Sequence, residues 1–374
     1  MENPPLAIKK NNGGRGKCPM SGVHKPLPAD FRDIRKVLVR TANWIGDAVM
    51  TLPALASIRE GLPNRHIAVL TKPWVADLFS GHPLIDEVIL YESPGRHSGI
   101  RGKWNLAGEL KKEQFDLAIL FQNAFEAALL AYLAGIPQRT GYNTDARGIL
   151  LTHAVPVNGS VKRGHQVDYY RALTAGLGFP SRPSAPSLPL AKSQRDESER
   201  ILNLRGLQAE KRLIGLGPGA AYGPAKRWFP ERFSALADRF SREWGAHILI
   251  FGSQGDRGAV SQLIQTVRSE VSDFTGQTTL SQAIGLLARC RLFVSNDSGL
   301  MHVAAALGIP VVAIFGSTDP GRTGPLGKNC RVVRKPLPCA PCLKTHCPEK
   351  QECLERITVD EVYEAAKGLW DPEV

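Results

Sequence analysis

Short apolar runs alternate with apolar-periodic stretches along the chain from residue 35 onward. Short runs bounded by polar residues or glycine are typical of buried parallel strands, whereas recurrence every three to four residues predicts helices. The first half of the chain predicts strands at 36–40, 66–70, 87–90 and 116–121, and helices at 47–59, 124–134 and 165–178. The second half predicts strands at 213–216, 247–251, 292–295 and 311–315, and helices at 231–244, 280–289 and 359–369. This order of elements predicts an α/β protein.

A proline-rich stretch at 179–192 separates the two series and carries no clear periodicity, which is typical of a linker. We therefore expect two Rossmann-like, doubly wound domains at 34–178 and 193–374, with a ligand cleft between their strand ends. Residues 1–33 are predicted to be a flexible basic extension. The last helix is expected to pack back across the linker.

Composition and charge narrow the class of protein. The 374 residues are 43% hydrophobic and 22% charged, as in a globular protein too long for one ordinary core. The net charge is +12, and the first forty residues hold nine basic and three acidic side chains. Two interpretations of that excess stay open: a solvated leader, or attraction to an anionic membrane face or a phosphorylated acceptor. No nucleic-acid-binding motif accompanies the charge, so we expect no nucleic acid partner.

The apolar segments also bear on location. No uninterrupted apolar run approaches the length that spans a bilayer, and Met1 to Lys10 lacks the apolar core of a secretory signal. We therefore expect a cytoplasmic protein.

The first loop that could do chemistry runs from the strand at 36–40 into the next helix. Gly46 lets the backbone approach a ligand closely, and Asp47 stands at the expected helix start. Two roles stay open for Asp47: it caps the helix, or it faces the cleft as a general base for an acceptor hydroxyl.

The second loop, at 215–228, opens the second domain as the first loop opens the first. Its glycines can bend round phosphates, and Lys226 and Arg227 supply countercharge. The loop matches neither the Walker pattern nor Gly-x-Gly-x-x-Gly, which disfavours nucleoside triphosphate hydrolysis. A ligand with a diphosphate group is the better prediction.

The third loop lies within 295–316, where a strand ends and a helix begins. Asp297, Ser298 and Gly299 fall at this junction, where free backbone amides favour a phosphate or a sugar hydroxyl. His302 follows one helical turn later and can face the same ligand.

Three segments together resemble a known family. They are Asn-Trp-Ile-Gly-Asp-Ala-Val-Met-Thr-Leu-Pro-Ala-Leu (43–55), Gly-Pro-Ala-Lys-Arg-Trp (223–228) and Asn-Asp-Ser-Gly-Leu-Met-His (296–302). In order and spacing they look like the ADP-heptose:lipopolysaccharide heptosyltransferases of glycosyltransferase family 9, most of all the heptosyltransferase II group. The resemblance covers the chain from about residue 35 and implies a GT-B fold, inversion at the anomeric carbon, and no metal or other cofactor in the reaction.

The resemblance also assigns roles to residues. It implies that Asp47 is the base for the acceptor hydroxyl, that Lys226 neutralises the departing diphosphate, and that Asp297 binds donor hydroxyls. The remaining donor contacts are expected from Gly219, Arg227, Ser298, Gly299 and His302. Acceptor contacts are expected from Asn43, Trp44, Arg96, Arg101 and Lys103. The basic segment 96–103 has a second interpretation, namely a solvated loop that contacts no acceptor.

The implied partners are the ADP-heptose donor, a heptosyl-Kdo2-lipid A acceptor and the cytoplasmic face of the inner membrane, to which the enzyme would be peripheral. Alternatives within the fold are the transferase that adds the first heptose, another family 9 transferase with a different acceptor, or a nucleotide-sugar epimerase.

The cysteines suggest an alternative function from another class of protein. Four of the seven, Cys339, Cys342, Cys347 and Cys353, crowd into residues 339–353. Such spacing can hold zinc or an iron–sulfur cluster, whereas a disulfide is less expected in a reducing cytosol. The alternatives are a structural metal, four reduced thiols on a loop, or a metal- or redox-responsive protein built on this loop.

Overall fold

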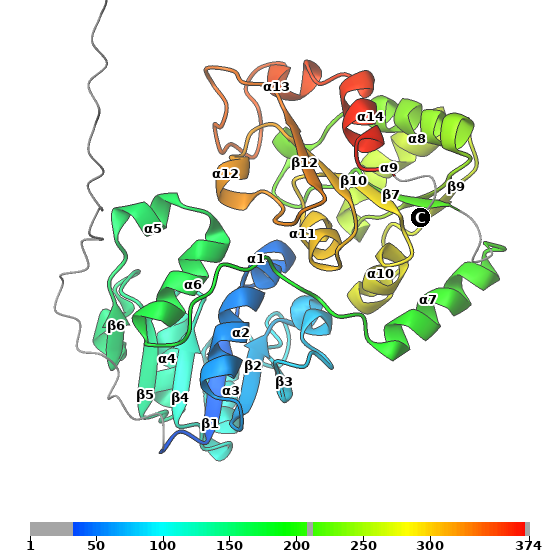
Figure 1. Ribbon diagram of the computed structural model, residues 1–374. Coiled ribbons are helices and arrows are strands. Elements are labelled where there is room, and N and C mark those ends of the chain that lie inside the picture. The colour runs from blue at the N-terminus through cyan, green and yellow to red at the C-terminus, as the bar shows by residue number, and fades with distance from the viewer. Residues whose placement is uncertain (1–32, 208–211, 371–374) are drawn as a thin grey trace, which may run out of the picture.

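The computed structural model describes residues 33–207 and 212–370, which form two lobes that each contain one parallel six-stranded sheet (Figure 1). The first sheet has the order β3-β2-β1-β4-β5-β6. Its strands are β1 (Lys36–Arg40), β2 (His66–Thr71), β3 (Glu87–Leu90), β4 (Leu117–Leu120), β5 (Gln138–Tyr142) and β6 (His153–Val155). The basic extension predicted at 1–33 lies outside the described residues apart from its last one.

The second sheet repeats this arrangement, with the order β12-β11-β10-β7-β8-β9. Its strands are β7 (Leu213–Gly217), β8 (His247–Ile250), β9 (Val271–Asp273), β10 (Leu292–Asn296), β11 (Val311–Phe315) and β12 (Cys330–Arg334). Numbered within its own half, each sheet has the order 3-2-1-4-5-6 of a doubly wound dinucleotide-binding fold. The predicted fold class is confirmed. The strand order reverses beside β1 in one sheet and beside β7 in the other, and ligands of such folds bind at these switch points.

Helices cover both faces of the first sheet. They are α1 (Ile45–Met50), α2 (Leu52–Gly61), α3 (Gly99–Lys112), α4 (Phe125–Leu133), α5 (Gly159–Arg163) and α6 (Gln166–Gly176), with 3-10 turns η2 (Pro73–Leu78) and η3 (Arg147–Leu150). Alternate residues of each strand serve opposite faces: Val37 and Val39 of β1 join the core beneath α1, α2 and α6, whereas Leu38 joins the core beneath α3 and α4.

The second sheet is covered in the same way. Its helices are α7 (Lys192–Leu204), α8 (Pro230–Trp244), α9 (Arg257–Thr266), α10 (Leu280–Leu287), α11 (Gly299–Ala306), α12 (Pro320–Thr323), α13 (Glu352–Glu355) and α14 (Val359–Lys367), with 3-10 turns η4 (Pro224–Lys226) and η5 (Gln254–Asp256). The core beneath α8, α9 and α14 contains Ile214 and Ile248, and the opposite core contains Leu213 and Leu249.

The two lobes meet through α1 and α11, which pack against each other between the sheets (Figure 1). One apolar core continues across this contact, since Val49 of α1 and Met301 of α11 belong to the same buried cluster. The helices that follow the central strands of the two lobes are thereby held together, which brings the ends of those strands into one region.

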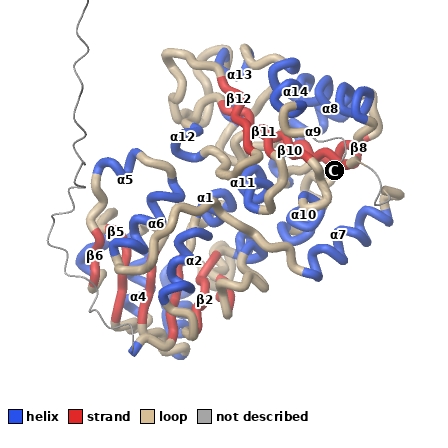
Figure 2. Tube along the Cα trace, viewed as in Figure 1, coloured by secondary structure: helices blue, strands red, loops and turns tan. Residues whose placement is uncertain are grey.

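Some predicted elements differ from the structure. The helix expected at 47–59 begins at Ile45 and is divided at Thr51 into α1 and α2. The proline-rich segment runs between α6 and α7 as a loop (Figure 2). The last helix, α14, packs on α8, β11 and β12 rather than across this loop, because Val362 and Ala366 on its apolar face join the core of the second lobe. Within 33–207 and 212–370, no helix combines the length and apolarity needed to cross a bilayer.

Candidate functional site

Asp47 lies in the first turn of α1, after the loop that leaves the carboxyl end of β1. The N-cap position of this helix is Trp44, and no side chain caps the helix end. The structure therefore does not support the capping role that the sequence left open for Asp47, and its carboxylate is available for other chemistry.

The electrostatic surroundings of Asp47 come from both lobes. Burial raises the pKa of Asp47 to about 6, the positive charge of Lys226 opposes the rise, and the negative charge of Asp297 adds to it. Tyr170, on α6 of the first lobe, interacts electrostatically with Asp47. Burial raises the pKa of Tyr170, and the negative charge of Asp47 raises it further. A carboxyl group with a pKa near 6 is mostly ionised at neutral pH, yet basic enough to accept a proton.

Lys226 and Asp297 form a close ion pair in the second lobe. The Lys226 Nζ lies 2.6 Å from Asp297 Oδ2, and the Thr318 hydroxyl donates to the same oxygen at 2.6 Å. The side chains of the pair are only 13% and 6% exposed, and the ammonium also lies 4.7 Å from the centre of the Tyr222 ring. Since η4 carries Lys226 and Asp297 directly follows β10, the pair joins the loops at a switch point of the second sheet.

Two glycines allow α1 and α11 to approach each other closely. A methyl group added at Gly46 would lie 2.8 Å from Cδ2 of His302, and one added at Gly299 would lie 2.9 Å from Cβ of Ile45. His302 thus packs against the opposite lobe, and burial lowers its pKa to about 4. Its imidazole is neutral at physiological pH, so it can donate one hydrogen bond and accept another but supplies no charge.

Gly219 and Arg227 are joined by Asp256, which the sequence analysis missed. A methyl group at Gly219 would lie 2.3 Å from Cγ of Asp256, and Arg227 Nη2 lies 3.3 Å from Asp256 Oδ1. The backbone amide and hydroxyl of Ser253 donate to the other carboxylate oxygen at 2.9 and 2.6 Å. Asp256 therefore fixes the glycine-rich loop, and no motif around residue 256 marks that role.

The basic segment predicted as a loop at 96–103 is partly helical, because α3 begins at Gly99. Arg96 pairs with Glu92 at 3.1 Å and with Glu109 at 3.5 Å, and Lys103 pairs with Glu126. Arg101, on the same turn of α3, is exposed. Of the three basic residues expected to contact an acceptor, Arg96 and Lys103 are thus engaged within the lobe.

A buried cationic network that sequence reasoning missed lies behind Asn43. Arg40 is 1% exposed and donates from Nη2 to Asn43 Oδ1 at 2.7 Å, while the carbonyl of Asn43 accepts from Trp74 Nε1 at 2.8 Å. Lys72 lies 3.6 Å from the centre of the Tyr91 ring. Burial lowers the pKa of Arg40 to about 10, and burial followed by the charge of Arg40 lowers the pKa of Lys72. The signal was present in the sequence, since Arg40 ends the apolar strand β1 and Lys72 directly follows the apolar strand β2.

Several large apolar side chains are exposed at the carboxyl edge of the first sheet. Trp44, Trp74, Trp104 and Phe125 are 62%, 48%, 58% and 41% exposed. They follow β1, β2, β3 and β4 along the chain, and Ile100 on the first turn of α3 is 77% exposed. Since carboxyl ends of parallel strands share one edge, these side chains surround the same rim as the loop that leads to Asp47.

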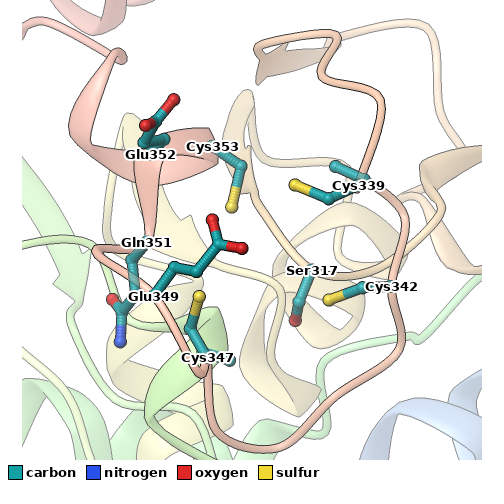
Figure 3. Close-up of a pocket in the computed structure, with 10 residues that line it drawn as sticks. Ser317, Cys339, Cys342, Cys347, Glu349, Gln351, Glu352 and Cys353 are labelled. Carbon is teal, nitrogen blue, oxygen red and sulfur yellow. The ribbon is translucent and has the colours of Figure 1, made fainter.

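The four clustered cysteines are free thiols that line one cavity in the second lobe (Figure 3). Burial raises the pKa of Cys353, and the other three thiols add to the rise. In the part of the chain that the structure describes, no group of three or more His, Cys, Asp or Glu side chains stands in a metal-holding arrangement. The four thiols therefore line the same cavity without converging on one point.

Comparisons with known proteins identify the family to which this chain is similar. A family model described as glycosyltransferase family 9 (heptosyltransferase) matches residues 103–352. Lipopolysaccharide heptosyltransferase 2 of Escherichia coli strain K12 is 34% identical over 309 residues, which cover 80% of this chain and 88% of that protein. Lipopolysaccharide heptosyltransferase 1 of Pseudomonas aeruginosa is 29% identical over 331 residues, 84% of this chain and 87% of that protein. The solved structure of E. coli ADP-heptose heptosyltransferase II matches with a TM-score of 0.77 and 30% identity, covering 89% of this chain and 98% of that one.

Proposed function

Because the chain belongs to glycosyltransferase family 9, the heptosyltransferases, we propose that it transfers L-glycero-D-manno-heptose from ADP-heptose to the first heptose of the lipopolysaccharide inner core. The observation that carries the proposal is that Asp47 in one lobe lies within reach of the charges of Lys226 and Asp297 in the other lobe, which shift its pKa. The greater identity to a heptosyltransferase 2 than to a heptosyltransferase 1 supports the second-heptose acceptor over the first.

The proposed reaction is a single displacement. Asp47 accepts the proton of an acceptor hydroxyl while that oxygen forms a bond to the anomeric carbon of the donor heptose. The bond from this carbon to the ADP oxygen breaks, its electron pair leaves with ADP, and the anomeric configuration inverts. Lys226 and the amino end of α11 stabilise the negative charge that develops on the departing diphosphate.

The donor contacts follow from the same arrangement. Asp297 would accept hydrogen bonds from donor hydroxyls when Lys226 turns to the diphosphate. The remaining contacts would come from Gly219, Arg227, Ser298, Gly299 and the neutral His302. Since Lys226 and backbone amides meet the diphosphate charge, the proposed reaction includes no metal ion.

The acceptor side is the rim of the first sheet, where Asn43, Trp44, Arg96, Arg101 and Lys103 would meet the inner core. Exposed tryptophans beside basic side chains suit the interface of an anionic membrane that presents a lipid-linked acceptor. We therefore place the enzyme peripherally on the cytoplasmic face of the inner membrane.

This placement predicts a loss of lipid binding when the rim loses its apolar side chains. Replacing Ile100 and Trp104 by serine should weaken binding to vesicles that contain anionic phospholipid by roughly tenfold or more, because each large apolar side chain contributes about 1.5–3 kcal/mol when fully buried. Vesicle co-sedimentation measures the change. Leu204→Ser is the matched control, since Leu204 is 73% exposed on α7 of the other lobe. Equal loss in both variants would contradict the placement.

The raised pKa of Asp47 predicts an acid limb in the pH profile of kcat/KM. The base must be ionised, so activity should rise as pH increases through about 6 and then level off, falling about tenfold per pH unit below it. Asp297→Asn removes a charge that raises this pKa, and should move the limb to lower pH. A profile that stays flat between pH 5 and 8 would exclude Asp47 as the base.

A product assay tests the activity directly. The full chain is incubated with ADP-heptose and, separately, with heptosyl-Kdo2-lipid A and with Kdo2-lipid A, and products are identified by mass spectrometry. We expect one heptose to be added to the first acceptor and none to the second. Transfer to Kdo2-lipid A alone would identify the first-heptose activity, and transfer to neither would overturn the proposal.

A further inference from the structure

The cavity of the second lobe brings together four thiols from one segment of chain. Cys339, Cys342, Cys347 and Cys353 line it together with Ala225 and Ser317 (Figure 3). Three of the cysteines lie in the irregular segment between β12 and α13, and Cys353 lies on α13. The proposed transfer chemistry uses none of these side chains.

A second observation at the same cavity points to a missing partner. The Ser317 hydroxyl is 2% exposed and makes no hydrogen bond, although it lines this cavity. A buried hydroxyl without a partner is unfavourable. A thiolate sulfur would accept a hydrogen bond from this hydroxyl, and metal-bound thiolates commonly receive such hydrogen bonds from neighbouring groups.

The cysteine segment also forms the wall behind Lys226. The carbonyl of Thr345 accepts from the Ala225 amide at 3.0 Å, and the carbonyl of Leu343 accepts from the Tyr222 hydroxyl at 2.8 Å. The Leu343 amide in turn donates to the Ser317 carbonyl at 2.8 Å. The position of the lysine loop is therefore set by backbone groups that lie between cysteines of the cavity.

Close packing makes this support sensitive to small movements. A methyl group at Gly223 would lie 2.4 Å from the Thr345 carbonyl oxygen, so the two loops touch along their backbones. Residues 341–350 are exposed or half-buried and form no regular structure, so they contribute little apolar packing of their own. A chelated ion can hold an irregular segment of this size that has no core of its own.

We propose that Cys339, Cys342, Cys347 and Cys353 bind one zinc ion as four thiolates and that this ion fixes the loop carrying Lys226. The proposal goes beyond the transfer reaction, because the ion touches neither donor nor acceptor. Binding releases one proton from each thiol and involves no oxidation. The ion would draw the sulfurs from their present positions around the cavity into a tetrahedron, and the Ser317 hydroxyl would donate to one of them.

Metal content of the full-length protein tests the site without reference to activity. Purified chain, reduced and dialysed against zinc, should contain about one zinc per chain by elemental mass spectrometry. Cobalt(II) loaded in its place should give the thiolate-to-metal and ligand-field absorption of a tetrahedral sulfur site. Cys347→Ser and Cys353→Ser should lose the metal. Cys330→Ser is the matched control, because Cys330 is a free thiol on β12 outside the cavity, and it should keep the metal.

The effect of the zinc ion on the loop that carries Lys226 is tested by a separate measurement. Chelated wild-type protein should show kcat/KM for ADP-heptose lowered by about 10- to 100-fold, since misplacing a catalytic group by about 1 Å has effects of that order, and added zinc should restore it. Glu349, whose carboxylate also lines the cavity, should be replaceable by glutamine without loss of zinc.

Three outcomes decide the proposal. Stoichiometric iron that disappears with the same cysteine variants would support the four-thiolate site and change only its ion. Loss of zinc in Glu349→Gln would overturn the four-thiolate assignment. Reduced protein that takes up neither zinc nor cobalt would overturn the site altogether, whether or not the serine variants fold.

Discussion

Replacing Asp47 by asparagine is expected to lower kcat for heptose transfer by about 10²- to 10⁴-fold, the usual contribution of a positioned general base. Asparagine keeps the size of the side chain but cannot accept a proton at neutral pH. Lys226 retains Asp297 as its partner in this variant, so no buried charge is left unpaired. Single-turnover transfer from ADP-heptose to heptosyl-Kdo2-lipid A measures the effect.

Three measurements separate a lost base from a damaged fold. The thermal unfolding temperature of Asp47→Asn should stay equal to that of the wild type or rise, because burial disfavours the ionised carboxyl group that the substitution removes. The affinity for ADP should change little, and the acid limb near pH 6 should vanish from the residual activity. Wild-type turnover in this variant would show that another group takes the proton.

Strands could be predicted from the sequence where they form short apolar runs. The strands β1, β3 and β11 occupy the predicted residues, and short apolar runs bounded by polar residues identified them. The strands β5 and β12 were not predicted, because they are partly exposed and carry polar side chains in Gln-Arg-Thr-Gly-Tyr and Cys-Arg-Val-Val-Arg. Their strand character comes from pairing with a neighbouring strand, which no local pattern encodes.

The helix α3 is another element that the local sequence pattern did not predict. It contains Gly99, Gly102 and Gly108, which weaken any prediction of a helix. A methyl group at Gly102 would lie 2.3 Å from the His97 carbonyl carbon, so close packing against the preceding turn requires glycine there. The exposed basic segment was consequently interpreted as a loop.

The positions of the candidate residues in the fold could be predicted, whereas their pairings could not. Asp47, Lys226 and Asp297 all follow central strands, where a doubly wound sheet places its ligands, and the sequence singled them out as candidates whose roles stay predictions. The contact of Gly219 with Asp256, and the burial of Arg40 behind Asn43, depend on how side chains from distant segments pack. No spacing along the chain reports those distances.

Removing the ammonium group of Lys226 is expected to lower kcat by about 10²- to 10³-fold, as does the loss of one group that stabilises developing negative charge. The ammonium lies 2.6 Å from Asp297 without substrate, so Lys226→Ala also leaves a carboxylate unpaired that is 6% exposed. The variant should therefore unfold at a lower temperature as well. It should also raise the pKa of Asp47 and move the acid limb to higher pH, because the charge of Lys226 lowers that pKa.

The double variant Lys226→Ala/Asp297→Asn separates the two effects. It removes the unpaired carboxylate, so its unfolding temperature should recover most of what Lys226→Ala loses. Its turnover should stay low, because the ammonium of Lys226 no longer faces the departing diphosphate. Lys226→Arg, which keeps a positive charge on a longer side chain, should retain part of the activity and of the ADP affinity. If turnover recovered together with stability in the double variant, Lys226 would act only by holding Asp297 in place, and the charge on the leaving group would have to be met by other residues.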